Sequence, residues 1–140
     1  MGKKKIVLEK VIESIEMAMD TAHYFYDFET NDLVSVIDYS SLKEDEEILE
    51  MVDMFPDRFV AMPEKYEFNE YSVMENFIDA FPECRLKEEL YQCIKGKGAF
   101  RKFKDELQYT GIIEWWYAFK DEAITNFAKE WCEDRGYEYK

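Results

Sequence analysis

Between residues 7 and 37 the spacing of the apolar side chains changes, and this change constrains the fold more than any other feature of the chain. Residues 7–19 place apolar side chains every three or four positions, which predicts an amphipathic helix. Residues 22–38 are rich in aromatic and β-branched side chains, with turn residues Thr30, Asn31 and Asp32 at their centre. The sequence therefore predicts a helix followed by a β-hairpin.

The predicted hairpin needs a partner, because an isolated hairpin is only marginally stable in water. Residues 58–63, RFVAMP, end in a proline and fit a third strand at the edge of a small sheet. Before them, Ser41 and Glu44 predict a capping box that starts a helix, and Pro56 ends it. This helix is expected to expose an acidic face and to bury an apolar stripe of Leu42, Ile48, Leu49, Val52 and Phe55.

After residue 63 the apolar side chains follow only helical spacing. About four helices are predicted, over residues 69–81, 83–95, 99–111 and 112–135. The fold class is therefore α+β, with an N-terminal helix and small antiparallel sheet in residues 1–63 and a helical half in residues 64–140. At 140 residues the chain is expected to form a single domain with one shared core.

The charge balance limits the kinds of partner that this chain can bind. Lys and Arg number 18 against 32 Asp and Glu, which gives a formal net charge of -14. This balance argues against a general nucleic-acid binder and against docking on an anionic membrane. It leaves open an acidic mimic of nucleic acid, which would present carboxylates along one continuous face to a basic partner.

The three cysteines and the single histidine give no pattern that binds a metal. Cys84, Cys93 and Cys132 lack the paired spacing of a zinc site, and His23 stands alone, so neither a metal nor another cofactor is predicted. A Cys–His couple for nucleophilic catalysis would require the fold to bring distant residues together. An odd number of thiols, with no signal peptide visible, predicts a protein of the reducing cytoplasm.

A basic segment interrupts this acidic chain at residues 94–108, IKGKGAFRKFKDELQ. Two glycines permit unusual backbone conformations there, and a helix that starts near residue 99 would present free N–H groups to an anion. The spacing matches neither a Walker A loop nor a dinucleotide-binding fingerprint. The candidate anion-binding residues are Lys95, Gly96, Lys97, Gly98 and Arg101.

A structural alternative accounts for the same segment without a ligand. Arg101 could pair with Asp105, and Lys102 with Glu106, because each pair is four residues apart on one helix. Arg101 or Lys104 could also reach the acidic pair at residues 121–122, while Phe100 and Phe103 would face the core. The sequence leaves open whether Lys95, Lys97 and Arg101 face water or the fold.

The helix of residues 112–135 contains the aromatic run WWYAF. A stacking platform for bases would require exposed rings beside positive charge, whereas burial in the core explains these residues unaided. We expect most of them in the core, with Trp115 or Trp116 at a surface groove. The candidate partner surface therefore consists of Trp115, Trp116 and Lys104.

Three segments carry a resemblance to a known family. Residues 96–105, GKGAFRKFKD, fit the pattern G-[RK]-G-A-F-R-x-F-K-D, and residues 116–123 fit W-Y-x-F-[RK]-D-E-A. Residues 69–78 contain a third match, at Asn69, Glu70, Tyr71, Met74, Glu75, Phe77 and Ile78. In these segments the chain resembles the bacterial uncharacterised protein family 0158, most closely over residues 57–135. The resemblance implies a bacterial origin and a shared fold, and it implies no reaction.

These observations favour a non-enzymatic interaction or regulatory module that binds another macromolecule, a protein or other partner, at the glycine-rich basic segment. Two alternatives stay open beside it: an enzyme or binder of a phosphorylated small molecule or nucleotide at the same segment, and the acidic mimic. A deep pocket beside residues 96–101 would favour the enzyme, whereas a flat or convex surface would favour the module.

Overall fold

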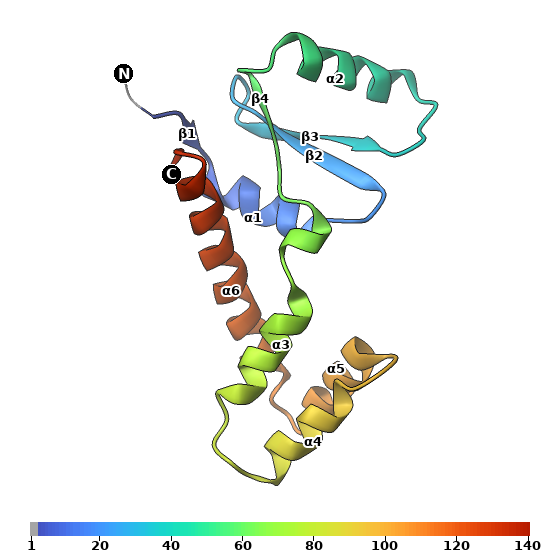
Figure 1. Cartoon of the computed structure of the whole chain (residues 1–140), viewed down its shortest axis with the longest axis vertical. Helices are drawn as coiled ribbons and strands as arrows, with labels where there is room; N and C mark the ends of the chain where they lie inside the picture. The colour runs from blue at the N-terminus through green and yellow to red at the C-terminus, as the bar shows by residue number, and fades with distance from the viewer. Residues whose placement is uncertain (1–2) are drawn as a thin grey trace. The chain divides into compact units, whose positions relative to one another are not determined.

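The computed structural model describes residues 3–140, which form six α-helices, one short 3₁₀-helix and two small sheets (Figure 1). The predicted α+β class is confirmed. The chain divides into two compact units: the residues up to Phe68 together with Ile124–Lys140, and Asn69–Ala123. The second unit interrupts the first in sequence, and the division falls within the last helix, α6 (Ile113–Asp134).

A three-stranded antiparallel sheet is the centre of the first unit. Strands β2 (Ala22–Asp27) and β3 (Asp32–Ile37) form the predicted hairpin, with Ala22 opposite Ile37 and Asp27 opposite Asp32. The predicted third strand, β4 (Phe59–Ala61), pairs with the other edge of β2, so the strand order is β3-β2-β4. Asn31 adopts a left-handed conformation in the turn, which an asparagine tolerates better than most residues.

A second, parallel pair of strands was not predicted. Strand β1 (Lys5–Ile6) pairs with β5 (Glu138–Tyr139), so the two ends of the described chain lie side by side in the first unit (Figure 1). Each strand has only two residues, which is too short for the alternation of apolar and polar residues that identifies a strand in a sequence.

Helix α1 (Leu8–Met17) and the last turns of α6 supply the rest of the core of the first unit. Tyr26 of β2 is fully buried there, and its hydroxyl donates a hydrogen bond to Asn31 Oδ1 at 3.0 Å. The buried side chains around it are Ile6, Val11, Ile15, Met62, Ile124, Ala128, Trp131 and Cys132. The amphipathic helix predicted at residues 7–19 thus forms over Leu8–Met17 and buries Val11 and Ile15, whereas Met19 lies beyond its end and is exposed.

The second unit is helical and is built around aromatic rings. It contains α3 (Glu70–Asp79), α4 (Arg85–Cys93), α5 (Ala99–Tyr109) and the first turns of α6. The ring of Phe77 lies at 5.5 Å from Trp116, 5.3 Å from Phe119 and 6.0 Å from Phe103, all near edge-to-face. Asn69 caps α3 as expected, because its side chain accepts a hydrogen bond from the Ser72 N–H at 3.1 Å. A core shared by both units stays a prediction.

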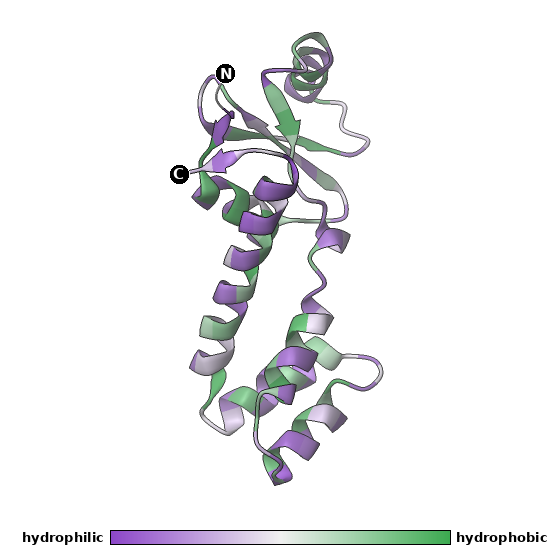
Figure 2. Ribbon diagram, turned by 60° about the vertical axis from the view of Figure 1, so that its left-hand side comes forward, coloured by the Kyte–Doolittle hydropathy of each residue, from purple (hydrophilic) through white to green (hydrophobic). Residues whose placement is uncertain are grey.

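Helix α2 (Lys43–Met54) differs from the prediction in two ways. Leu42 is its N-cap and the capping box at Ser41 does not form; instead the Ser40 hydroxyl accepts a hydrogen bond from the Leu42 N–H at 3.1 Å. The expectation that α2 buries an apolar stripe is also wrong, because none of the helix residues is buried. Figure 2 shows both hydrophobic and hydrophilic residues along α2. Strand β3 is the main element that α2 packs against. Because a single strand is narrow, it covers only part of the stripe.

Candidate functional site

The glycine turn, residues 94–98, links α4 to α5 in the second unit. Gly96 and Gly98 have φ angles of 77° and 74°, which residues with a Cβ rarely adopt. A Cβ at Gly96 would meet no atom within 4 Å, so glycine is required there for its backbone conformation and not for a close approach. The Tyr71 hydroxyl donates a hydrogen bond to the Ile94 carbonyl at 2.9 Å and ties the turn to α3.

The basic side chains of this turn face water. Lys95, Lys97, Arg101 and Lys102 are all exposed, and Lys104 is half-buried. None of the ion pairs formed among residues 3–140 includes one of these five side chains. The expected Arg101–Asp105 and Lys102–Glu106 pairs are absent, so the structural alternative does not account for these charges. Exposed pairs four residues apart stabilise a helix by only about 0.2–0.5 kcal/mol, which explains why they need not form.

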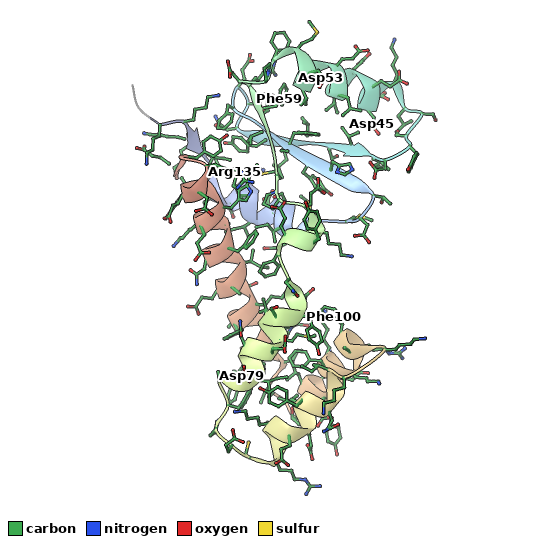
Figure 3. All side chains as sticks on the ribbon, viewed as in Figure 1. Asp45, Asp53, Phe59, Asp79, Phe100 and Arg135 are labelled. Atoms are coloured by element: carbon green, nitrogen blue, oxygen red, sulfur yellow. The ribbon has the colours of Figure 1, made fainter. Side chains whose placement is uncertain are left out.

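Phe100 lies among these bases and is 41% exposed, whereas Phe103 is fully buried. The expectation that both rings face the core is therefore wrong for Phe100. The buried stripe of α5 consists of Phe103 and Leu107, one turn apart, and Phe100 precedes it in the first turn of the helix. Figure 3 labels Phe100 at this end of α5. An exposed ring thus accompanies the exposed charges.

An open groove lies next to the glycine turn. This shallow groove runs between α4 and α5 and is lined by Gln92, Cys93, Lys102, Asp105, Glu106 and Tyr109. None of residues 94–101 lines this groove. The candidate anion-binding residues Lys95, Gly96, Lys97, Gly98 and Arg101 therefore lie together on an exposed turn, outside this groove.

The predicted partner surface is only partly assembled. Trp115 is 62% exposed, with its ring 6.5 Å from that of Phe81, but Trp116 is fully buried, so its place on a partner surface is wrong. Trp115 also follows the C-terminal end of α5, whereas the glycine turn precedes its N-terminal end. A helix of this length spans roughly 16 Å, so Trp115 and the glycine turn are separate surfaces of the second unit.

Sequence reasoning missed a charged cluster in the first unit. His23 Nε2 lies 2.6 Å from Asp38 Oδ1, and His23 Nδ1 lies 3.0 Å from Glu64 Oε1. Hydrogen bonds to Glu64 and then to Asp38 raise the pKa of His23, because the protonated ring can donate to both carboxylates at once. Only the pairing of β2 with β3 and β4 brings these residues together, so no local motif could have indicated the cluster.

The same geometry argues against a Cys–His couple. Both ring nitrogens of His23 already contact carboxylates. Cys132 is fully buried, and burial raises the pKa of its thiol to about 11, so little nucleophilic thiolate is present near neutral pH. Burial also raises the pKa of Cys93.

We expect the His23 cluster to make stability depend on pH. A pKa raised above the ordinary 6.5 means that the charged ring stabilises the fold. This stabilisation is complete below the ordinary pKa and is lost as the pH rises through the higher folded-state value. Urea unfolding between about pH 6 and pH 9 should show wild type losing stability relative to His23→Gln as the pH rises. If the free energy of unfolding changed with pH in the same way for the two proteins, this assignment would be contradicted.

Among residues 3–140, no three His, Cys, Asp or Glu side chains are arranged to hold a metal ion together. Within the same residues, no helix is both long and apolar enough to cross a membrane.

Comparison with known proteins places the chain among relatives of unknown activity. No solved structure matches it. A UPF0158 protein of Pseudomonas aeruginosa is 24% identical over 129 residues, which covers 88% of this chain and 80% of that protein. The sequence model of an uncharacterised protein family, UPF0158, matches residues 3–140. Because this match covers nearly the whole chain, the protein belongs to the UPF0158 family.

Proposed function

We propose that this protein is a cytoplasmic, non-enzymatic interaction module that binds an acidic surface of another macromolecule through its glycine turn. One observation carries the proposal: Lys95, Lys97, Arg101 and Lys102 are exposed and form no ion pair among residues 3–140, although the chain carries a net charge of -14. Cations that serve the fold would be expected to pair with some of the many carboxylates of the chain.

The exposed ring beside these charges supports the proposal. Arginine and aromatic side chains dominate the binding energy of many protein interfaces, and Phe100 and Arg101 are neighbours at the start of α5. The positive side chains would steer an acidic partner and fix its orientation, while the ring would lose contact with water on binding. The glycines hold the two helices so that the bases project from a short turn.

The shape of the surface favours a macromolecular partner over a small phosphorylated ligand. Sites for small molecules are concave and bury most of the ligand. The groove between α4 and α5 is open and shallow, and residues 94–101 do not line it. A projecting turn instead fits a surface or groove on a larger partner.

The test uses immobilised protein to capture partners from a bacterial lysate, with quantitative mass spectrometry of the captured proteins. Lys97→Ala/Arg101→Ala should reduce capture of the specific partner about tenfold, which corresponds to about 1.4 kcal/mol of binding energy. The control, Lys65→Ala/Arg85→Ala, removes two exposed cations elsewhere and should leave capture unchanged. Added salt should weaken binding in the wild type.

Two outcomes would overturn the proposal. In the first, the double variant captures every protein as well as wild type does. In the second, inorganic phosphate or ATP shifts the amide signals of residues 96–101 in a saturable way, and no macromolecule does so; this would favour the small-molecule alternative. A partner lost after nuclease treatment of the lysate would be nucleic acid and not an acidic protein.

A further inference from the structure

The space between α2 and the sheet of the first unit forms a pocket of about 190 Å³. Val36, Ile37 and Leu49 supply apolar lining from β3 and α2, while Asp38, Asp45 and Glu46 supply carboxylates. Figure 3 labels Asp45 on α2, near the end that follows the hairpin. The pocket therefore combines apolar walls with negative charge. It belongs to the first unit, whereas the glycine turn belongs to the second.

Several apolar side chains around this pocket are left uncovered, although Val36 is buried. None of the residues of α2 is buried, and Ile37, Leu42 and Leu49 are each about half exposed to water. Burying a large apolar side chain fully stabilises a protein or complex by roughly 1.5–3 kcal/mol. A contiguous exposed patch rimmed by polar groups is typical of an interaction site. The periodic stripe of α2 is thus available to a second molecule.

The charge carried by α2 is almost entirely negative, and the one histidine of the pocket lining, His23, already pairs with Asp38 and Glu64. Helix α2 carries a single cation, Lys43, against six carboxylates: Glu44, Asp45, Glu46, Glu47, Glu50 and Asp53. No ion pair formed among residues 3–140 includes any of these seven side chains. A cationic occupant would gain from these carboxylates, and an acidic occupant would be repelled. A second copy of the chain is disfavoured as occupant because each copy carries a net charge of -14.

We propose that the α2–β3 pocket, bounded by Ile37, Asp45, Glu46 and Leu49, docks a basic amphipathic segment of another protein. Apolar side chains of the segment enter between α2 and β3, and its lysines or arginines contact the carboxylates of α2. This surface is distinct from the glycine turn, which carries the opposite charge and would bind a different partner.

The test uses a short synthetic peptide in which leucines follow helical spacing and lysines fill the other positions. Fluorescence anisotropy should show saturable binding to wild type. Asp45→Lys/Glu46→Lys should weaken it at least about tenfold, since two attractive contacts become repulsive. Leu49→Ser should also weaken it; this residue is exposed, so the variant is expected to fold. The control Glu75→Lys/Asp79→Lys reverses two exposed charges on α3 and should bind as wild type does.

Two control peptides separate the parts of the interaction. Glutamate in place of lysine, or serine in place of leucine, should abolish binding. Amide shifts caused by the leucine–lysine peptide should cluster at residues 36–49. The proposal is overturned if the control variant binds as weakly as the pocket variant, or if the shifts lie elsewhere. A wild-type dimer in sedimentation velocity that Leu49→Ser dissociates would also overturn it, in favour of a second copy as occupant.

Discussion

Replacing Trp116 by alanine is expected to lower the free energy of unfolding by about 3–5 kcal/mol. The indole is fully buried in the second unit, with its ring 5.0 Å from that of Phe103 and 5.5 Å from that of Phe77. Removing it would leave a cavity that the surrounding helices can fill only in part. Urea unfolding followed by far-UV circular dichroism measures the loss without relying on tryptophan fluorescence.

The neighbouring residue provides a matched control. Trp115→Ala removes the same side chain from the same helix, but that side chain is 62% exposed, so the loss should stay below about 1 kcal/mol. Similar losses for the two variants would contradict the assignment of Trp116 to the core and Trp115 to the surface. The same comparison tests the conclusion that Trp116 is not part of a partner surface.

The second large effect is expected at Asp27, at the end of β2. Its two carboxylate oxygens accept hydrogen bonds from Arg58 Nε and Nη2, both at 2.9 Å, and its side chain is only 4% exposed. Asp27→Ala should destabilise the protein by about 3 kcal/mol, because it leaves a partly buried guanidinium without this partner. The Asp27 carboxylate also accepts a hydrogen bond from the Glu29 N–H at 2.9 Å, which the variant loses too.

Glu29 is the control for this prediction, since its carboxylate contacts the same guanidinium at 3.1 Å but is 68% exposed. Glu29→Ala should cost less than about 1 kcal/mol. Arg58 lowers the pKa of Asp27 below its ordinary value of 3.8. The stabilisation is therefore present above that ordinary value and lost as the pH falls through the lower folded-state pKa. As the pH is lowered, the difference in the free energy of unfolding between wild type and Asp27→Ala should shrink. A difference that stays constant would contradict the assignment.

Much of the fold could be predicted because its signals are local. Helical spacing identified α1 and the four helices after residue 63, and turn residues identified the hairpin. Asn69 at the start of α3 and the glycines that end helices are likewise readable from short segments. The strands β1 and β5 could not be predicted, because each is two residues long and forms only when the two ends of the chain meet.

The candidate sites were harder to predict because exposure depends on contacts made by distant residues. Periodicity placed Phe100 in the core and α2 over a buried stripe, yet α5 buries only its later turns and α2 has a single strand to cover it. The pairing of His23 with two carboxylates likewise depends on three strands meeting in one register.

The order and type of the main elements, the family resemblance and the position of the basic glycine turn can all be read from the residues alone. These properties follow from side-chain chemistry and spacing within a few turns of chain. The folded structure was needed to establish that Lys95, Lys97 and Arg101 face water, that Trp116 is buried while Trp115 is exposed, and that a pocket lined by apolar side chains and carboxylates lies between α2 and β3. Burial and charge pairing depend on which surfaces meet in space, and local spacing does not determine which surfaces meet.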